Sequence, residues 1–236
     1  MSESPLVAFT VDVEPDCPPY LNGFRGIEHG MPRLLDLLAE ERVPATFFTT
    51  GEVATRFPEV VDRIVRDGHE LASHGMTHRA FTTLAPVEAR REIEESATIL
   101  RRSATVTSFR APYLRFPSTY LPLLESAGFT LDSSQAKYKA AYYRDRATTS
   151  LLRVPASVTS SVLRLPRVVR AAYLAAVSDP VVLFVHPWEF VDLRKEQLRI
   201  DCRFRTGDTA LECVRTVLRG YKTKGARFTR MAELSA

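Results

Sequence analysis

Hydrophobic residues form two kinds of pattern along this chain. Short continuous apolar runs flanked by turn residues are typical of strands buried on both faces of a sheet. Longer segments with apolar residues three or four positions apart predict helices with one buried face. The expected strands cover residues 6–11, 45–50, 70–72, 129–132, 180–185 and 226–228, and a further short strand is expected just before Arg110. The expected helices cover residues 30–41, 58–67, 84–102, 122–127 and 209–224.

The alternation of these strands and helices predicts an α/β fold with a mainly parallel sheet. No repeat, low-complexity tract or long linker interrupts the pattern, so we expect a single domain spanning residues 1–236. Residues 138–176 have no sustained period, and we expect them to shape substrate access. Within them, Arg164, Arg167 and Arg170 could meet a phosphate or lipid surface, although spaced arginines beside apolar residues more often form an ordinary amphipathic face.

Composition and charge exclude several classes of protein. The 236 residues are 45% apolar and 25% charged, as in a globular protein with a full core. The net charge of +4 is spread along the chain, which argues against a nucleic-acid-binding module. Three cysteines without Cys-x-x-Cys spacing indicate neither a disulfide framework nor a thiolate metal site. The first apolar run is too short for a signal peptide or membrane span, so we expect a cytoplasmic protein.

Two groups of side chains predict a metal site. Asp12, Glu14 and Asp16 follow the first strand, and residues two apart in an extended chain face the same side. His74 and His78 follow a later strand. Each group alone also fits a plain turn or a solvated helix face. Together, one carboxylate and two imidazoles make a triad that leaves ligand positions open for water and substrate.

Three further residues stand where strands are expected to end. Arg110 could hold a carboxylate ionised, although a surface arginine beside a turn is the simpler alternative. His186 is either a buried core histidine or a general acid that protonates a leaving amine. Trp188 is either a core residue or a platform for a sugar ring.

Five short segments, in this order, resemble the motifs of the polysaccharide deacetylases of carbohydrate esterase family 4, which share the chitooligosaccharide deacetylase homology domain. The matching segments are residues 10–14, 73–78, 110–113, 132–134 and 183–186. The resemblance extends from Val7 to about Phe228. It implies a distorted (β/α)7 barrel with its site at the carboxyl ends of the strands.

The resemblance also implies a reaction, in which an N-acetyl group is hydrolysed from an amino sugar or glycan by metal-bound water. Asp12 would be the general base and His186 the general acid. Arg110 would hold Asp12, Asp132 would tune the neighbouring charges, and the backbone N–H of Tyr113 would help to stabilise the oxyanion.

The metal implied by the resemblance is divalent, most often Zn²⁺, held by His74, His78 and an acidic residue. The common first motif has adjacent aspartates, whereas here Val13 separates Asp12 from Glu14. That spacing, with the His-Pro-Trp-Glu run at His186, resembles a subgroup in which Glu14 takes the ligand position. Asp16 remains the alternative third ligand.

The substrate is less defined by the sequence. Tyr113, Leu183 and Trp188 are the residues expected to contact it. Residues 24–35 also resemble deformylases of a lipid-linked formamido sugar, and one methyl separates acetyl from formyl. The resemblance thus implies an amino sugar or glycan as the substrate, and a nucleotide- or lipid-linked sugar is one form that it could take. A carbohydrate-binding pseudoenzyme is the non-catalytic alternative, and a homo-oligomer is possible.

Overall fold

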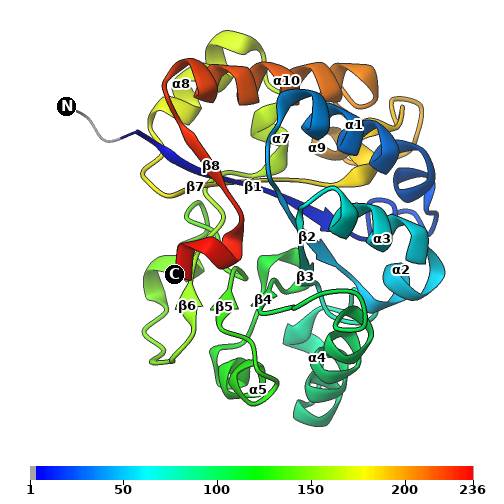
Figure 1. Cartoon of the computed structure of the whole chain (residues 1–236), viewed down its shortest axis with the longest axis vertical. Helices are drawn as coiled ribbons and strands as arrows, with labels where there is room; N and C mark the ends of the chain where they lie inside the picture. The colour runs from blue at the N-terminus through cyan, green and yellow to red at the C-terminus, as the bar shows by residue number, and fades with distance from the viewer. Residues whose placement is uncertain (1–3, 236) are drawn as a thin grey trace. The chain divides into compact units, whose positions relative to one another are not determined.

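The structure is a computed structural model that describes residues 4–235 (Figure 1). The chain divides into two compact units, which are described separately. The first unit comprises Met1–Ala45 and Ser157–Thr229, and the second comprises Thr46–Ala156 and Arg230–Ala236.

The first unit is built around strand β1 (Leu6–Val13). β1 pairs in parallel with β7 (Val181–Val185) on one side and with β8 (Arg227–Thr229) on the other. Seven of the eight residues of β1 and all five of β7 are buried, as expected for strands covered on both faces. This pairing brings the carboxyl ends of β1 and β7 to the same edge of the sheet.

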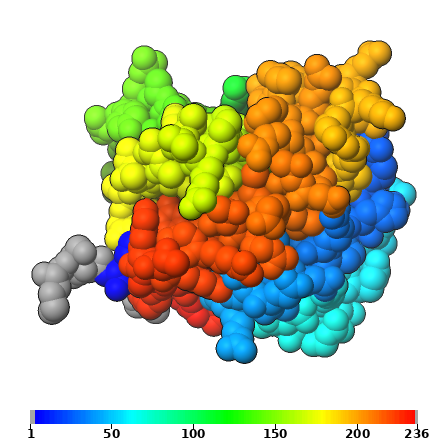
Figure 2. Space-filling model, turned by 90° about the horizontal axis from the view of Figure 1, so that it is seen from above, coloured from blue at the N-terminus to red at the C-terminus, as the bar shows by residue number. Residues whose placement is uncertain are grey.

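Helices cover the strands of the first unit. The two long ones, α1 (Met31–Glu41) and α10 (Asp208–Thr223), lie side by side in Figures 1 and 2. Each presents one apolar stripe inward, including Leu34 and Leu38 from α1 and Val214 and Leu218 from α10. The remaining helical segments of this unit are η1 (Gly26–Gly30), α7 (Ser160–Leu163), α8 (Arg167–Ala175), η5 (Pro187–Phe190) and α9 (Ile200–Arg203).

The second unit contains five parallel strands that pair in chain order. They are β2 (Thr46–Thr49), β3 (Glu70–Ser73), β4 (Ser108–Phe109), β5 (Leu131–Asp132) and β6 (Leu152–Arg153). The intervening helices are α2 (Gly51–Arg56), α3 (Pro58–Arg66), η2 (Phe81–Thr83), α4 (Pro86–Leu100), η3 (Pro112–Leu114), η4 (Ser118–Tyr120), α5 (Leu121–Ser126) and α6 (Ala140–Arg144), and η6 (Met231–Ser235) follows near the C-terminus.

The core of the second unit centres on Phe109, whose ring makes edge-to-face contacts with Phe81, Phe116 and Phe129 at centroid distances of 5.7, 5.5 and 5.5 Å. Such aromatic pairs add to the stabilisation that comes from burial alone.

The predicted parallel α/β arrangement is confirmed within each unit, because every strand pairing described here is parallel. The long helices lie where their apolar stripes predicted them, within about two residues at each end. The sequence pattern missed α2, the two-residue strand β6 and the helices α6, α7 and α9, because elements of six residues or fewer are too short to show a period. It also missed α8, which has nine residues but buries only Arg170 and so presents no apolar stripe to a core. No helix in residues 4–235 has both the length and the apolar content needed to cross a bilayer.

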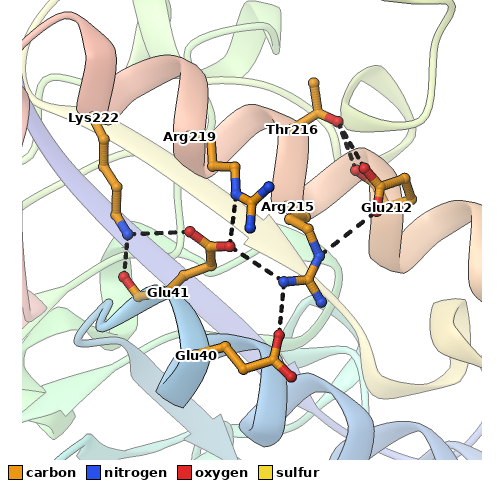
Figure 3. A network of polar contacts seen from close by, with 7 residues as sticks. All are labelled: Glu40, Glu41, Glu212, Arg215, Thr216, Arg219 and Lys222. Carbon is orange, nitrogen blue, oxygen red and sulfur yellow. Dashed lines mark hydrogen bonds and ion pairs between the residues drawn. The ribbon is translucent and has the colours of Figure 1, made fainter.

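A charged cluster joins α1 to α10 in the first unit (Figure 3). Glu41, at the end of α1, is 7% exposed and pairs with Arg215, Arg219 and Lys222 of α10. Glu40 is 59% exposed and pairs only with Arg215 among these residues. Burial disfavours the charge on Glu41, but hydrogen bonds from Lys222 and Arg219 outweigh it and lower the pKa of this carboxyl below its ordinary value of 4.5.

We expect Glu41→Gln to lower the free energy of unfolding by about 1–2 kcal/mol, less than for a fully buried pair because the cations keep contact with water. The matched control Glu40→Gln should cost under about 0.5 kcal/mol. Since the folded-state pKa of Glu41 is depressed, its contribution is complete above pH 4.5 and is lost as the pH falls below that value. Urea titrations at pH 7 and at acidic pH test this, and equal costs for the two variants at pH 7 would contradict it.

Candidate functional site

Three buried carboxylates, Asp12, Glu14 and Asp16, lie at the end of β1 or just after it. Asp16 accepts hydrogen bonds from the backbone N–H groups of Arg25 and Gly26, one on each carboxylate oxygen, at 2.9 and 2.8 Å. A Cβ at Gly23 would lie only 2.8 Å from an Asp16 oxygen, so Gly23 allows this close approach. Asp16 therefore anchors the loop that precedes η1, and both of its carboxylate oxygens are engaged by backbone N–H groups.

Glu14 and His186 lie together at this edge of the first unit. Trp188 donates its indole N–H to Glu14 Oε1 at 3.1 Å. The His186 ring stacks on Trp188 with centroids 4.7 Å apart, and His186 Nε2 lies 3.8 Å from the same Glu14 oxygen. Trp188 is 5% exposed, so it orients Glu14 and His186 rather than presenting an open face to a sugar.

Glu189 fixes the orientation of His186. Its Oε1 accepts hydrogen bonds from His186 Nδ1 at 2.8 Å and from the His186 backbone N–H at 3.0 Å. Because a carboxylate only accepts, Nδ1 carries the hydrogen, and Nε2 points toward Glu14. Burial disfavours the charged ring, but the Glu14 carboxylate and then the Glu189 hydrogen bond outweigh it and raise the pKa of His186 to about 9.

Arg164 holds Glu189 from the opposite side. Its Nε lies 2.7 Å from Glu189 Oε2, and its other nitrogens donate to the backbone carbonyls of Asp201, Cys202 and Phe204. Both side chains of this ion pair are almost fully buried. Burial raises the pKa of the Glu189 carboxyl, but the Arg164 charge and the His186 hydrogen bond outweigh burial and lower it.

The second unit carries the two candidate histidines. The Nδ1 of His74 lies 2.7 Å from the carbonyl oxygen of Arg110, which has no proton to give. Nδ1 is therefore the protonated nitrogen, and Nε2 keeps its lone pair available for a metal. The rings of His74 and His78 are 5.3 Å apart between centroids, and both side chains are buried.

Glu92 of α4 shapes the loop between these histidines. Its carboxylate accepts hydrogen bonds from the backbone N–H groups of Met76 and Thr77 at 2.8 and 2.9 Å, and also from the Thr77 hydroxyl. The loop includes Gly75 at φ 79° and His78 at φ 57°, two left-handed conformations that such anchoring helps to maintain.

Arg110 is fully buried, which excludes the surface-arginine alternative. Its guanidinium lies 4.1 Å from the centre of the Phe48 ring and donates to the Ser133 hydroxyl at 2.9 Å. The next backbone N–H, of Ala111, donates to the Ser134 hydroxyl at 2.8 Å. The two serines therefore hold the Arg110 segment in place.

Asp132 is buried and bonded within the second unit. It accepts hydrogen bonds from the Ser134 backbone N–H at 2.9 Å and from Arg153 at 3.1 Å. Burial raises the pKa of the Asp132 carboxyl, although Ser134 and Arg153 work in the opposite direction.

Tyr113 lies beside His78, with ring centroids 4.8 Å apart, and is 38% exposed. Its backbone is left-handed at φ 61°, and its carbonyl accepts a hydrogen bond from Lys139 Nζ at 2.6 Å. Lys139, Leu114 and Tyr142 line a pocket of about 540 Å³. Part of the irregular stretch from residue 138 onward thus borders the segment that carries Tyr113.

The structure thus gathers the sequence-predicted residues into two sets. The first unit holds Asp12, Glu14, His186 and Trp188 around the ends of β1 and β7, and Leu183 lies within β7 with its side chain fully buried. The second unit holds His74, His78, Arg110, Tyr113 and Asp132 around the ends of β3, β4 and β5.

Sequence reasoning gave no role to Glu92 or Glu189, and it placed Arg164 on a phosphate or lipid surface. The last expectation is wrong, because Arg164 is 1% exposed and is paired with Glu189. One signal was available for Glu189, which stands three residues after His186 at the spacing of a capping box. No local signal marks Glu92, since its partners lie 15 and 16 residues away.

Solved structures share this fold. A protein described as a polysaccharide deacetylase from Mycobacterium smegmatis superposes with a TM-score of 0.72 at 23% identity, over 98% of this chain and 88% of that one. A family 4 pseudoenzyme from Bacillus anthracis gives a TM-score of 0.65 at 17% identity, over 99% of this chain and 66% of that one. The predicted fold class, a distorted (β/α)7 barrel of the polysaccharide-deacetylase type, is confirmed by this likeness.

The family model for polysaccharide deacetylase matches residues 2–131, more than half of the chain. The chain therefore belongs to the polysaccharide deacetylase family. It is 38% identical over 100 residues to a chitooligosaccharide deacetylase of Sinorhizobium fredii, a match that covers 41% of this chain and 46% of the relative. The match thus spans about half the length of such relatives.

We expect Glu189→Gln to lower the free energy of unfolding by about 3 kcal/mol, because it leaves the buried Arg164 without its counter-ion. The matched control is Glu196→Gln in the same unit. Glu196 is 34% exposed and pairs with Arg25, so its loss should cost under about 1 kcal/mol. Urea unfolding of both variants measures the difference, and a Glu189 cost no larger than the Glu196 cost would show that the buried pair is not stabilising.

Proposed function

We propose that this protein is a metal-dependent hydrolase that removes an N-acetyl group from an amino sugar or glycan. The observation that carries the proposal is His74, whose Nδ1 is committed to the Arg110 carbonyl so that Nε2 is left as a metal donor beside His78. Family membership supports it, as does the chitooligosaccharide deacetylase among the relatives.

The proposed metal ligands are Glu14, His74 and His78. Their donor set is one carboxylate oxygen and two imidazole nitrogens, all from buried residues, and it suits Zn²⁺ or a similar divalent ion. When bound, such an ion supplies Lewis-acid chemistry toward water and the amide carbonyl. Asp16 is not part of the set, because its carboxylate oxygens hold backbone N–H groups.

The proton transfers are assigned to residues of this chain. Asp12 is the proposed general base that removes a proton from the attacking water, and Arg110 is proposed to keep it ionised. His186 is the proposed general acid that donates a proton to the leaving amine. The hydrogen bond to Glu189, which is not a metal ligand in this proposal, favours the protonated ring that this role requires.

Other side chains have positioning roles in this proposal. Glu189 and Trp188 orient His186, and the exposed Tyr113 is available to contact the sugar. Asp132 would act on the charge balance through Arg153, its partner in the structure. A substrate contact by Leu183, a nucleotide or lipid attached to the sugar, a homo-oligomer and a cytoplasmic location stay predictions.

Metal content tests the ligand set. The purified wild-type protein, reloaded with Zn²⁺, should hold about one equivalent by plasma mass spectrometry. His74→Ala and Glu14→Ala should lose it, whereas Asp16→Asn should keep it even if its loop makes the protein less stable. Loss of metal in Asp16→Asn but not in Glu14→Ala would make Asp16, and not Glu14, the third metal ligand. A folded wild type that takes up no zinc, cobalt or nickel would end the proposal.

Turnover tests the reaction. Release of free amine from N-acetylglucosamine oligomers should be detectable in the wild type, and His186→Gln should lower kcat by about 10²–10⁴-fold while leaving the metal content unchanged. An N-formylated sugar assayed in parallel tests the deformylase alternative, which a higher kcat/KM for the formyl compound would favour.

A non-catalytic sugar-binding protein is the second candidate, favoured by the likeness to the Bacillus anthracis pseudoenzyme. Metal-loaded protein that binds the oligomers without releasing amine would establish it.

A further inference from the structure

A second pocket lies in the first unit and is lined by residues of α8 and α10. Figure 1 shows these two helices next to each other. It has a volume of about 240 Å³, enough for a small ligand. Its lining residues come from these two helices and the turn after α10, and they include none of the residues assigned to the proposed reaction.

The charge of this pocket is strongly one-sided. Arg167, Arg170 and Lys224 line it, and no carboxylate does. Among residues 4–235, none of the three cations forms an ion pair. Arg170 is 5% exposed, and one of its nitrogens donates to the Leu163 carbonyl at 2.9 Å, which fixes the side chain at the pocket wall. Three unpaired positive charges around one small hollow attract an anion.

Tyr221 of α10 provides an independent sign of a missing partner. It lines the pocket and is 6% exposed, yet its hydroxyl is the one buried side-chain hydroxyl in the described chain that has no hydrogen-bond partner. A buried polar group without a partner costs about 1–3 kcal/mol, so such groups are rare without a reason. Burial, with a smaller contribution from the charge of Asp179, raises the pKa of Tyr221 to about 12, so the phenol remains a hydrogen-bond donor.

Gly220 lines the pocket without a side chain. It lies inside α10, where glycine is less favourable than alanine by about 0.5–1 kcal/mol. A Cβ at this position would have no atom within 4 Å, so no packing requires the glycine. Its presence leaves space for a ligand at a cost to helix stability.

From these observations we infer that the α8–α10 pocket binds a phosphate group, with Arg167, Arg170 and Lys224 as its charged contacts and the Tyr221 hydroxyl as a neutral donor. The guanidinium groups suit phosphate because they offer paired donors to its oxygens. The phosphate pocket and the proposed reaction use different residues, so an experiment can disprove one of the two proposals without disproving the other.

The phosphate has two possible sources. It can be free or belong to a small soluble ester, or it can be a lipid headgroup. The outer face of α8 exposes Val168, Val169 and Tyr173 to 82, 51 and 52%, and apolar side chains beside cations also occur on helices that lie on anionic membranes. The pocket chemistry is the same in both cases.

Calorimetric titration of the whole chain with inorganic phosphate, at low ionic strength, is the first experiment. We expect saturable binding that Lys224→Ala, Arg167→Ala and Gly220→Leu each weaken by about tenfold or more. Tyr221→Phe should also weaken binding, while its thermal stability without phosphate stays equal or rises, because the change removes an unpartnered hydroxyl. The matched control Lys195→Ala removes an exposed cation elsewhere in the unit and should bind like the wild type.

Sedimentation with vesicles distinguishes the sources. Phosphatidylcholine alone is compared with an equimolar mixture of phosphatidylcholine and phosphatidylglycerol. Binding of free phosphate without vesicle binding identifies a soluble phosphate ligand. Vesicle binding that requires phosphatidylglycerol and is lost in Lys224→Ala and Gly220→Leu, but not in Lys195→Ala, identifies the headgroup. Neither kind of binding, or binding that all variants retain equally, would overturn the inference.

Discussion

The cost of burying charge governs the arrangement of this molecule's functional side chains. Arg164 and Glu189 are both almost fully buried, and neither would be tolerated there without the other. Glu189 then has one oxygen left for His186, so the ion pair fixes which ring nitrogen carries a hydrogen and which one faces Glu14. The stability of the first unit and the orientation of its candidate general acid therefore rest on the same interaction.

In the second unit, backbone groups and hydroxyls provide the hydrogen-bond partners of the buried charged and polar side chains. Arg110 is buried over the Phe48 ring and against Ser133, and the carbonyl of Arg110 sets the tautomer of His74. Glu92 satisfies two backbone N–H groups in the histidine loop. His186 and His74 are thus both oriented by a group that belongs to a buried polar network.

The sequence predicted the elements whose burial is continuous, such as β1 and β7, because a run of apolar residues reports burial directly. It also predicted the types of residue in the site, since carboxylates and imidazoles after strands are visible without coordinates. It could not predict Glu189 as the partner of Arg164, or Glu92 as the anchor of the histidine loop, because these contacts join residues 15 or more positions apart. Local patterning carries no information about such pairs.

Trp188 shows how burial changes an interpretation that residue type alone leaves open. A tryptophan beside a candidate acid suggested a sugar platform, yet its indole N–H is bonded to Glu14 and one face is stacked on His186. Because Trp188 contacts both groups, it holds the Glu14 carboxylate and the His186 imidazole in one relative orientation. Under the proposed function, the sugar contact is assigned to Tyr113, which is partly exposed and lies against His78. The two rings differ because Trp188 is almost fully buried, whereas Tyr113 still reaches solvent.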